Sequence, residues 1–267
     1  MTAIVTSYLA LGIDVGGTGI KGAPVDVSTG ELIAERHRIP TPVDSTPEAV
    51  AAIVAQIAEH FAGVLPPDAP VGVTFPGVVQ HGTVRTAANV DRAWIDYPGE
   101  QLFSTAMHRP CVLVNDADAA GVAEARFGAA KDATGFVIVT TLGTGIGVAL
   151  LHGGQLIPNA ELGHIEIGGD VAEKVTAASA KERDDLSYEK WAKRLQKYYS
   201  RIENLLWPDL FIVGGGISKK AHKFLPLLNL RTPIRPAILQ NNAGIIGAAA
   251  LAASARDSPT TDADVGP

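Results

Sequence analysis

The chain has 267 residues, 46% of them hydrophobic and 19% charged, and its formal net charge at pH 7 is −6. This composition predicts a globular protein with a sizeable core, and the acidic balance disfavours nucleic acid as a partner. Cys111 is the only cysteine, so an internal disulfide and a cysteine-based zinc site are excluded, and a reducing, cytoplasmic setting is expected. No signal peptide or membrane-spanning segment is predicted.

Strands dominate the first 40 residues. Apolar runs at residues 8–15, 20–27 and 31–39 are separated by glycine-rich turns, which predicts an antiparallel meander. Residues 47–63 then have apolar side chains at helical spacing, with Thr46 as the expected N-cap.

Two short buried strands follow, at residues 71–75 and 111–114, and a helix is predicted over residues 117–127. A similar order of elements then begins again. Its members are strands at residues 136–142, 147–151 and 210–213, and helices at residues 187–206 and 243–253.

The two halves therefore resemble each other and predict two α/β lobes with a cleft between them. We expect an N-terminal small lobe over residues 1–114 and a C-terminal large lobe over residues 115–253, with part of the last helix, about residues 243–253, free to pack on the first lobe. Residues 254–267 are rich in Ser, Thr, Asp and Pro and predict a disordered tail.

A glycine-rich turn ends the first predicted strand, where the sequence reads Asp14-Val15-Gly16-Gly17-Thr18 with Lys21 just beyond. Glycines let the backbone approach an anion and direct N–H groups at it, and the Thr18 hydroxyl adds a donor. Asp14 would repel a bare phosphate, so its expected partner is a magnesium ion or a water of that ion. The alternative is a plain tight hairpin.

One dinucleotide-binding pattern overlaps this turn. Residues 17–22 fit Gly-x-Gly-x-x-Gly, but that motif must open a helix, and residues 20–27 predict a strand. An NAD-dependent enzyme is therefore disfavoured.

Two further glycine-rich turns end strands in the second half. The first contains Thr141, Gly143, Thr144 and Gly145, and the other is Gly214-Gly215-Gly216. Together with the turn in the first half they predict a phosphate chain clamped between the lobes. The alternatives are a glycine hairpin and an ordinary strand–helix turn.

Asn115 and Asp116 stand between these turns, after a predicted strand and before a helix. A carboxylate at this position can take the proton from an attacking hydroxyl group. The alternative is that Asp116 only caps the helix.

Glu161, Gly163 and His164 follow the second hairpin, and Glu173 comes nine residues after the histidine. Carboxylates and imidazoles form directional hydrogen bonds with sugar hydroxyls. A lone histidine is more often structural, so the cluster as a whole indicates a sugar site more strongly than His164 alone.

Taken together, and in this order, these motifs resemble the sugar kinases of the ROK family, in the actin-like ATPase superfamily. The resemblance covers about residues 9–252. It implies a two-lobed, ribonuclease H-like α/β fold with a central cleft. Many members carry a cysteine-rich zinc segment after the Gly-His pair, and residues 165–182 contain no cysteine, so zinc is not expected.

Within the family, residues 161–167, 186–191 and 210–220 resemble the actinobacterial polyphosphate glucokinases and polyphosphate/ATP-glucomannokinases. This resemblance implies a cytoplasmic, homodimeric kinase that uses magnesium and transfers a phosphoryl group from polyphosphate or ATP to the 6-hydroxyl of glucose or mannose. The implied base is Asp116, and the implied sugar ligands are Asn89, Asn115, Asp116, Glu161, His164 and Glu173. The implied phosphate ligands are Asp14, Gly16, Gly17, Thr18, Lys21, Thr141, Gly143, Thr144, Gly145, Gly214, Gly215 and Gly216.

Several alternatives stay open at this point. The chain could be an ATP-only hexokinase of the same family, a sugar-binding regulator, or an acetate or glycerol kinase. Regulators carry an added DNA-binding domain, for which a first strand at residue 8 leaves no room. A basic track for polyphosphate is also expected, with candidates Lys21, Arg85, Arg92, Arg126 and Lys131.

Overall fold

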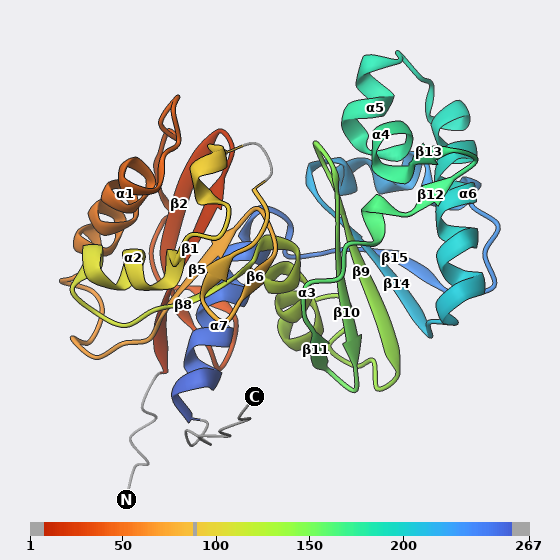
Figure 1. The fold of residues 1–267 in the computed structure, drawn as a ribbon. Coiled ribbons are helices and arrows are strands. Elements are labelled where there is room, and N and C mark those ends of the chain that lie inside the picture. The colour runs from red at the N-terminus through yellow and green to blue at the C-terminus, as the bar shows by residue number, and fades with distance from the viewer. Residues whose placement is uncertain (1–7, 88–89, 258–267) are drawn as a thin grey trace, which may run out of the picture.

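The computed structural model describes residues 8–87 and 90–257. Figure 1 shows two α/β halves, each built on one sheet, with helices α3 and α7 between them. The order of elements follows the repetition that the sequence predicts.

The first sheet has the strand order β3-β2-β1-β5-β8, with β4 also paired to β2. Strands β1 and β2 are antiparallel, whereas β1, β5 and β8 run parallel. The bounds are β1 Leu9–Gly16, β2 Gly19–Asp26, β3 Glu31–Leu32, β4 His37–Ile39, β5 Val71–Phe75 and β8 Val112–Asn115.

The third strand of the predicted meander is divided in two. β3 pairs with the end of β2 and β4 pairs with its beginning, and residues 33–36 bend away between them. Pro24 lies in β2 opposite this bend, and its missing N–H group weakens the ladder there.

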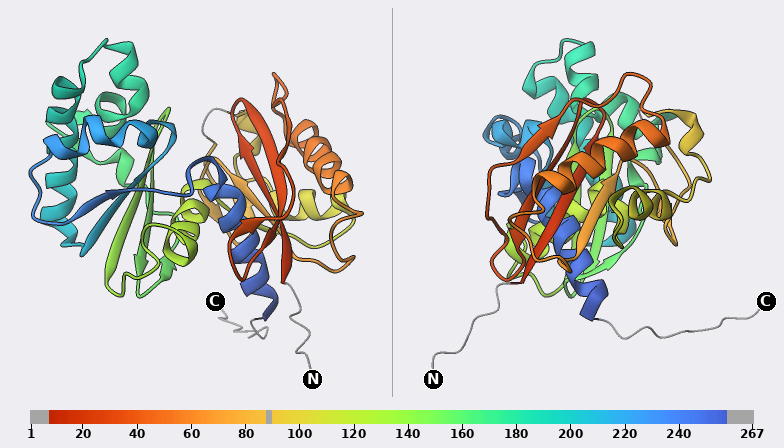
Figure 2. Two further views of the ribbon diagram at one scale, coloured as in Figure 1. Left: turned by 180° about the vertical axis from the view of Figure 1, so that it is seen from behind. Right: turned by 90° about the vertical axis from the view of Figure 1, so that its left-hand side faces the viewer.

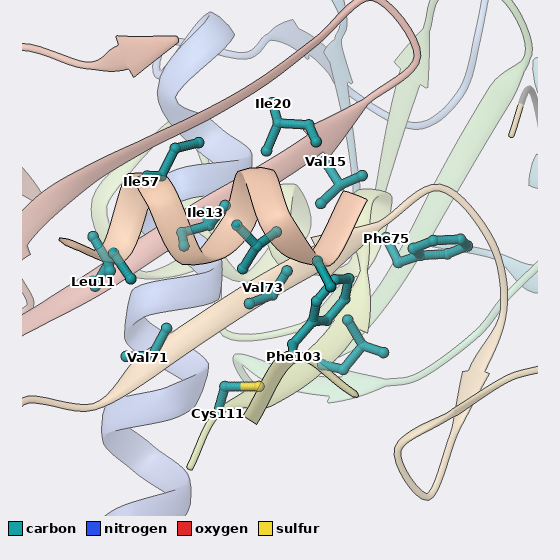
Figure 3. Close-up of a cluster of buried hydrophobic side chains, with 14 of the residues drawn as sticks. Leu11, Ile13, Val15, Ile20, Ile57, Val71, Val73, Phe75, Phe103 and Cys111 are labelled. Atoms are coloured by element: carbon teal, nitrogen blue, oxygen red, sulfur yellow. The ribbon is translucent and has the colours of Figure 1, made fainter. Parts of the chain in front are cut away.

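Helices α1 (Pro47–His60) and α2 (Gly99–Met107) cover one face of the first sheet. Figure 3 shows Ile57 of α1 above Ile13 and Val73, which are fully buried strand residues. The predicted cap is confirmed, because the Thr46 side chain accepts a hydrogen bond from the Ala49 amide at 3.3 Å. Helix α2 was not predicted, since its N-terminus has no capping side chain.

The second sheet has the strand order β11-β10-β9-β14-β15. Helix α6 (Tyr188–Leu206) packs on one face of it and buries Trp191 and Tyr199. The strand bounds are β9 Phe136–Leu142, β10 Ile146–His152, β11 Gln155–Ile157, β14 Leu210–Gly214 and β15 Ile234–Pro236.

Short elements fill the connections. Those of the first half are β6 Val79–Gln80, β7 Thr83–Val84 and η1 Arg92–Trp94. Those of the second half are η2 Leu162–His164, β12 Glu166–Ile167, β13 Asp170–Val171, α4 Ala172–Thr176, α5 Ala178–Arg183, η3 Gly216–Lys223, η4 Leu225–Leu227 and η5 Gln240–Asn242.

Helices α3 (Asp116–Phe127) and α7 (Ala243–Asp257) join the two halves. Figure 2 shows α7 on the face of the first sheet opposite α1, although α7 follows the second sheet in sequence. Small residues allow this close approach, because a side chain at Gly247 would overlap the carbonyl oxygen of Ala119. We propose the lobe boundary at residues 114 and 115, with α7 returning to the first lobe.

The prediction of a disordered tail over residues 254–267 is wrong for its first four residues. Helix α7 continues to Asp257, so residues 254–257 are helical, because Ser254 and Arg256 still bond to neighbouring backbone. The rest of the predicted tail, residues 258–267, lies outside the described residues. Among the helices that the structure describes, none is both long and apolar enough to cross a membrane.

Candidate active site

The carboxyl ends of β1, β8, β9 and β14 meet between the two sheets, which is where α/β proteins bind ligands. A cleft of about 580 Å³ lies there, with a pocket of about 160 Å³ adjoining it. The two cavities share Asp116, Ala117, Thr141 and Gly215. Residues from both halves of the sequence therefore line one continuous site.

Asp116 is the first residue of α3, and the preceding Asn115 is the N-cap. The Asn115 side-chain oxygen accepts hydrogen bonds from the amides of Ala117 at 2.9 Å and Asp118 at 3.0 Å, and its Nδ2 donates to the Gly77 carbonyl at 3.0 Å. Asn115 therefore has the capping role that was the alternative for Asp116. The Asp116 carboxylate is left at the junction of the two cavities.

The environment of Asp116 suits a general base. Burial raises the pKa of its carboxyl to about 7, and the charge of Asp14, followed by that of Glu161, adds to the rise. A hydrogen bond from the Ala117 amide at 2.8 Å opposes it. A pKa near neutrality leaves a fraction of the group ionised and basic enough to take a proton.

The first glycine turn contributes to both cavities. The Asp14 carboxylate, in the pocket, accepts a hydrogen bond from the Thr74 hydroxyl at 2.7 Å and pairs with the Lys21 ammonium at 3.0 Å. Gly16 and Gly17 line the cleft. Thr18 is exposed and lines neither cavity of the described structure, because its turn points it to solvent.

The second glycine turn faces the first across the cleft. Thr141, Gly143, Thr144 and Gly145 all line it. Helix α5 fixes this turn, since the Ser179 hydroxyl donates to the Thr144 carbonyl at 2.6 Å and the Ser179 amide to the Gly143 carbonyl at 3.1 Å. Within the turn, the Gly143 amide donates to the Gly145 carbonyl at 3.0 Å. The contacts with α5 engage only carbonyl oxygens of the rim, so they leave the Thr144 hydroxyl available.

The third turn contributes only in part. Gly214 and Gly215 line the pocket, and Gly215 has a φ of 81°, a conformation that favours glycine. Gly216 is exposed, lines neither cavity in the described part of the chain, and begins η3.

The predicted sugar cluster forms the far side of the cleft. His164 lies between two carboxylates, with its Nδ1 3.7 Å from Glu161 and its Nε2 3.3 Å from Glu173. Glu173 also accepts a hydrogen bond from the Ile146 amide at 3.1 Å. Burial raises the pKa of the Glu161 carboxyl, while the neighbouring His164 lowers it. Asn89, the remaining sugar candidate, lies outside the described residues.

Two residues that the sequence did not single out connect this site. Asp118 is buried, and its Oδ2 accepts a hydrogen bond from the Asn159 amide at 2.8 Å. The Asn159 side chain in turn donates to the Val79 carbonyl at 2.8 Å and accepts from the Val79 amide at 3.0 Å. The loop before Glu161 is thereby tied to both α3 and the first half. Nothing in the local sequence distinguishes Asp118 from an exposed helix residue.

The buried position of Asp118 disfavours the charged form of its carboxyl group. Its Oδ1 has no hydrogen-bond partner among the described residues. Burial raises its pKa to about 7, which the Asn159 amide opposes and the charge of Glu161 reinforces.

The polyphosphate candidates from the sequence do not form one track. Arg126 donates to the Ala250 carbonyl at 3.1 Å and so fixes α3 to α7, and Arg85 pairs with Asp96 at 2.9 Å. Only Lys21 of the five lines either cavity in the described structure.

Magnesium is the metal that the resemblance implies. Over the residues that the structure describes, no three His, Cys, Asp or Glu side chains form a metal-binding group. The site still suits magnesium, because this ion commonly binds one or two carboxylates together with substrate phosphates, and Asp14 presents one carboxylate beside the glycine turns.

Residues 10–176 match the ROK family, which is more than half of the chain. The chain belongs to the ROK family. It is 53% identical over 245 residues to a polyphosphate glucokinase of Mycobacterium tuberculosis (strain CDC 1551 / Oshkosh), and the match covers 91% of each protein.

Solved structures agree with this assignment. The crystal structure of inorganic polyphosphate/ATP-glucomannokinase from Arthrobacter sp. strain KM superimposes with a TM-score of 0.88 at 51% identity, covering 93% of this chain and 99% of that one. A ROK family glucokinase from Streptomyces griseus, solved with glucose and AMPPNP, has a TM-score of 0.80 at 24% identity, covering 94% and 100%. The predicted two-lobed, actin-like ATPase fold is confirmed.

Proposed function

We propose that this protein transfers the terminal phosphoryl group of inorganic polyphosphate or ATP to the 6-hydroxyl of glucose, with mannose as a second acceptor. The observation that carries the proposal is the position of Asp116, between the glycine turns and the His164 cluster. The 53% identity to a polyphosphate glucokinase and the 51% identity to a polyphosphate/ATP-glucomannokinase support it.

On the acceptor side, Glu161, His164 and Glu173 bind sugar hydroxyls in this proposal. Carboxylates accept hydrogen bonds from hydroxyl groups, and the imidazole can accept or donate. Because Glu173 is fixed by the Ile146 amide and by His164, its free lone pairs have a defined direction. Asn115 and Asn89 are further proposed sugar ligands, although the Asn115 side chain already caps α3 and donates to the Gly77 carbonyl.

On the donor side, the first and second glycine turns bind the phosphates through backbone N–H groups and the hydroxyls of Thr141 and Thr144. Asp14 would hold magnesium directly or through water, and the ion would supply charge neutralisation of the phosphates when bound. Lys21 adds a fixed positive charge 3.0 Å from Asp14.

The reaction itself needs one proton transfer. The sugar O6 attacks the terminal phosphorus, and its proton passes to the Asp116 carboxylate as the O6–P bond forms. The bond from phosphorus to the bridging oxygen breaks, and the electron pair leaves with ADP or with the shortened polyphosphate. Catalysis rests on positioning and on neutralising phosphate charge.

A direct assay tests the proposal. Purified protein is incubated with magnesium and each pair of glucose or mannose with long-chain polyphosphate or ATP, and hexose 6-phosphate is measured. We expect glucose 6-phosphate from polyphosphate. Product from ATP alone would instead support an ATP-only hexokinase, and no product from any pair would contradict the proposal.

We also propose a cytoplasmic homodimer. The single cysteine, Cys111, is buried and unpaired, and burial raises its pKa to about 11, so it suits a reducing compartment. Light scattering after gel filtration would give the mass, which for a dimer is twice 27.8 kDa.

A further inference from the structure

A group of lysines lies beside the rim of the cleft, on the second lobe. Gly215 lines the cleft, and the next residue begins η3, which carries Lys219, Lys220 and Lys223 on its exposed side. These lysines therefore follow, within eight residues of the chain, the glycine turn that borders the phosphate pocket.

A fourth lysine approaches the same place from α5. Ser179 of this helix bonds to the Gly143 and Thr144 carbonyls at the cleft rim, and Lys181 follows two residues later. The Lys181 ammonium lies 4.6 Å from the centroid of the Tyr188 ring, and the Lys223 ammonium lies 5.5 Å from the same centroid. Two segments therefore bring their positive charges to one aromatic ring.

The ring between these lysines is fixed. Tyr188 stacks on Phe224 with a centroid distance of 6.3 Å and an interplanar angle of 8°, and it meets Trp191 edge-on at 6.4 Å. Phe224 and Trp191 are fully buried. Cation–π contacts of this kind hold an ammonium group in place without neutralising its charge.

The positive charge is not cancelled locally. In the part of the chain that the structure describes, none of these four lysines forms an ion pair. The nearby Asp184 is engaged by Arg183 at 2.9 Å and Arg194 at 2.6 Å. Glu182, Asp185 and Glu189 are the remaining acidic neighbours of Lys181 in sequence, and none of them forms an ion pair among the described residues. Unpaired like charges repel each other, and their concentration on an acidic chain of net charge −6 favours an anionic ligand.

We infer that Lys181, Lys219, Lys220 and Lys223, which we call the lysine track, bind the phosphates of inorganic polyphosphate that lie beyond the one being transferred. This inference rests on the proposed function and extends it to the path of the donor. Each internal phosphate of the chain carries negative charge, so a long donor can contact the track while its end reacts beside Asp116. A donor of only a few phosphates is too short to contact the track and therefore gains less binding energy from it. ATP carries adenosine in place of further phosphates, so it also gains little from the track.

The test compares donors of different length. The double variant Lys181→Gln, Lys223→Gln removes two charges from the track. As a control, Lys193→Gln, Lys197→Gln removes two exposed charges of α6 that form no ion pair with any residue the structure describes. Initial rates with glucose are measured against long-chain polyphosphate, tripolyphosphate and ATP. We expect the track variant to raise KM for the long chain by about tenfold, the equivalent of ~1.4 kcal/mol, with kcat and the other two KM values changed less than twofold.

A second readout is independent of turnover. Filter binding of labelled long-chain polyphosphate should weaken about tenfold in the track variant only, and its dependence on salt should become shallower, because fewer ion contacts are lost as salt rises. Double-stranded DNA of similar length serves as a comparison polyanion, and we expect it to bind weakly and equally to all three proteins.

Each contrary result identifies what fails. The track would be overturned if KM rose equally for long-chain polyphosphate, tripolyphosphate and ATP, or if the control variant showed the same rise. It would also be overturned if DNA bound as tightly as polyphosphate and lost the same affinity in the track variant. If the wild-type protein forms hexose 6-phosphate from polyphosphate but the track variant has an unchanged KM, only the track is wrong. If the wild type forms no product from any donor, the proposed function fails first.

Discussion

Asp14 and Asp116 line one pocket between the two sheets, although they belong to different segments of the chain. Burial is the main cause that raises the pKa of Asp116 to about 7, and the negative charge of Asp14 is the next. The carboxylate that would hold magnesium therefore also tunes the carboxylate that would take the proton.

The pH dependence of turnover follows from this pKa. A general base must be ionised, so kcat/KM for glucose should rise with pH along one acid limb and then level off. The pKa of about 7 for Asp116 applies to the metal-free protein, and a cation at Asp14 would lower it, because it offsets the negative charge that helps to raise this pKa. Initial rates at saturating donor between pH 5 and pH 9 would show this limb. A profile that is flat from pH 5 to pH 8 would be inconsistent with Asp116 as the base.

Glu161→Gln should have two effects. It removes a sugar ligand that can accept charge-assisted hydrogen bonds, and KM for glucose should rise by roughly tenfold to a hundredfold, or about 1.5–3 kcal/mol. It also removes a negative charge that raises the pKa of Asp116, so the acid limb should move to lower pH. Rates measured across the same pH range give both values, and an acid limb that moves to higher pH would refute the coupling.

Asp118→Asn should change how stability depends on pH. The folded carboxyl titrates near pH 7 and the unfolded one near 3.8, so between these values the folded state holds a proton that the unfolded state has released. The wild-type protein therefore loses stability as pH rises from about 4 to about 7, by up to roughly 4 kcal/mol. The asparagine variant does not titrate.

The measurement is the melting temperature of both proteins at several pH values. The variant minus wild-type difference should increase by roughly 5 °C or more from pH 5 to pH 7.5 and then stay constant. A poorer fit of the amide would shift the difference in melting temperature equally at every pH and would leave its dependence on pH unchanged. A difference that does not vary with pH would show that Asp118 is not held at a raised pKa.

The contact between α3 and α7 predicts a sensitive glycine. A side chain at Gly247 would overlap the Ala119 carbonyl oxygen, and backbone cannot move aside as a flexible side chain does. Gly247→Ala should therefore destabilise the protein by about 3 kcal/mol, which lowers the melting temperature by roughly 6–12 °C. Gly63→Ala is the control, since nothing lies within 4 Å of that position. Similar melting temperatures for both variants would mean that the helices can separate at no cost.

Much of this architecture could be predicted because the local patterns are strong. The strand at residues 136–142 and the cap at Thr46 depend on hydrophobic periodicity and on a hydrogen bond within one turn. The bend between β3 and β4 depends on Pro24 in the neighbouring strand, and α2 lacks a capping side chain, so neither has a local pattern.

The site was predictable to the same degree. Asp116, Glu161 and His164 could be singled out because they follow strands and turns in a recognisable order, and the structure brings all three to one cleft. Asp118 and Asn159 were missed, because their importance comes from a contact between segments far apart in the sequence. The lysine track was missed for the same reason, since Lys181 and Lys223 meet only at the Tyr188 ring.

The most direct test of the central claim is Asp116→Asn, measured for turnover and for glucose binding on the same preparation. The amide keeps the size of the side chain but cannot take a proton at neutral pH. The account predicts that kcat falls by about 10²- to 10⁴-fold while the Kd for glucose changes less than severalfold. Turnover close to that of the wild type in this variant would contradict the assignment of Asp116 as the base.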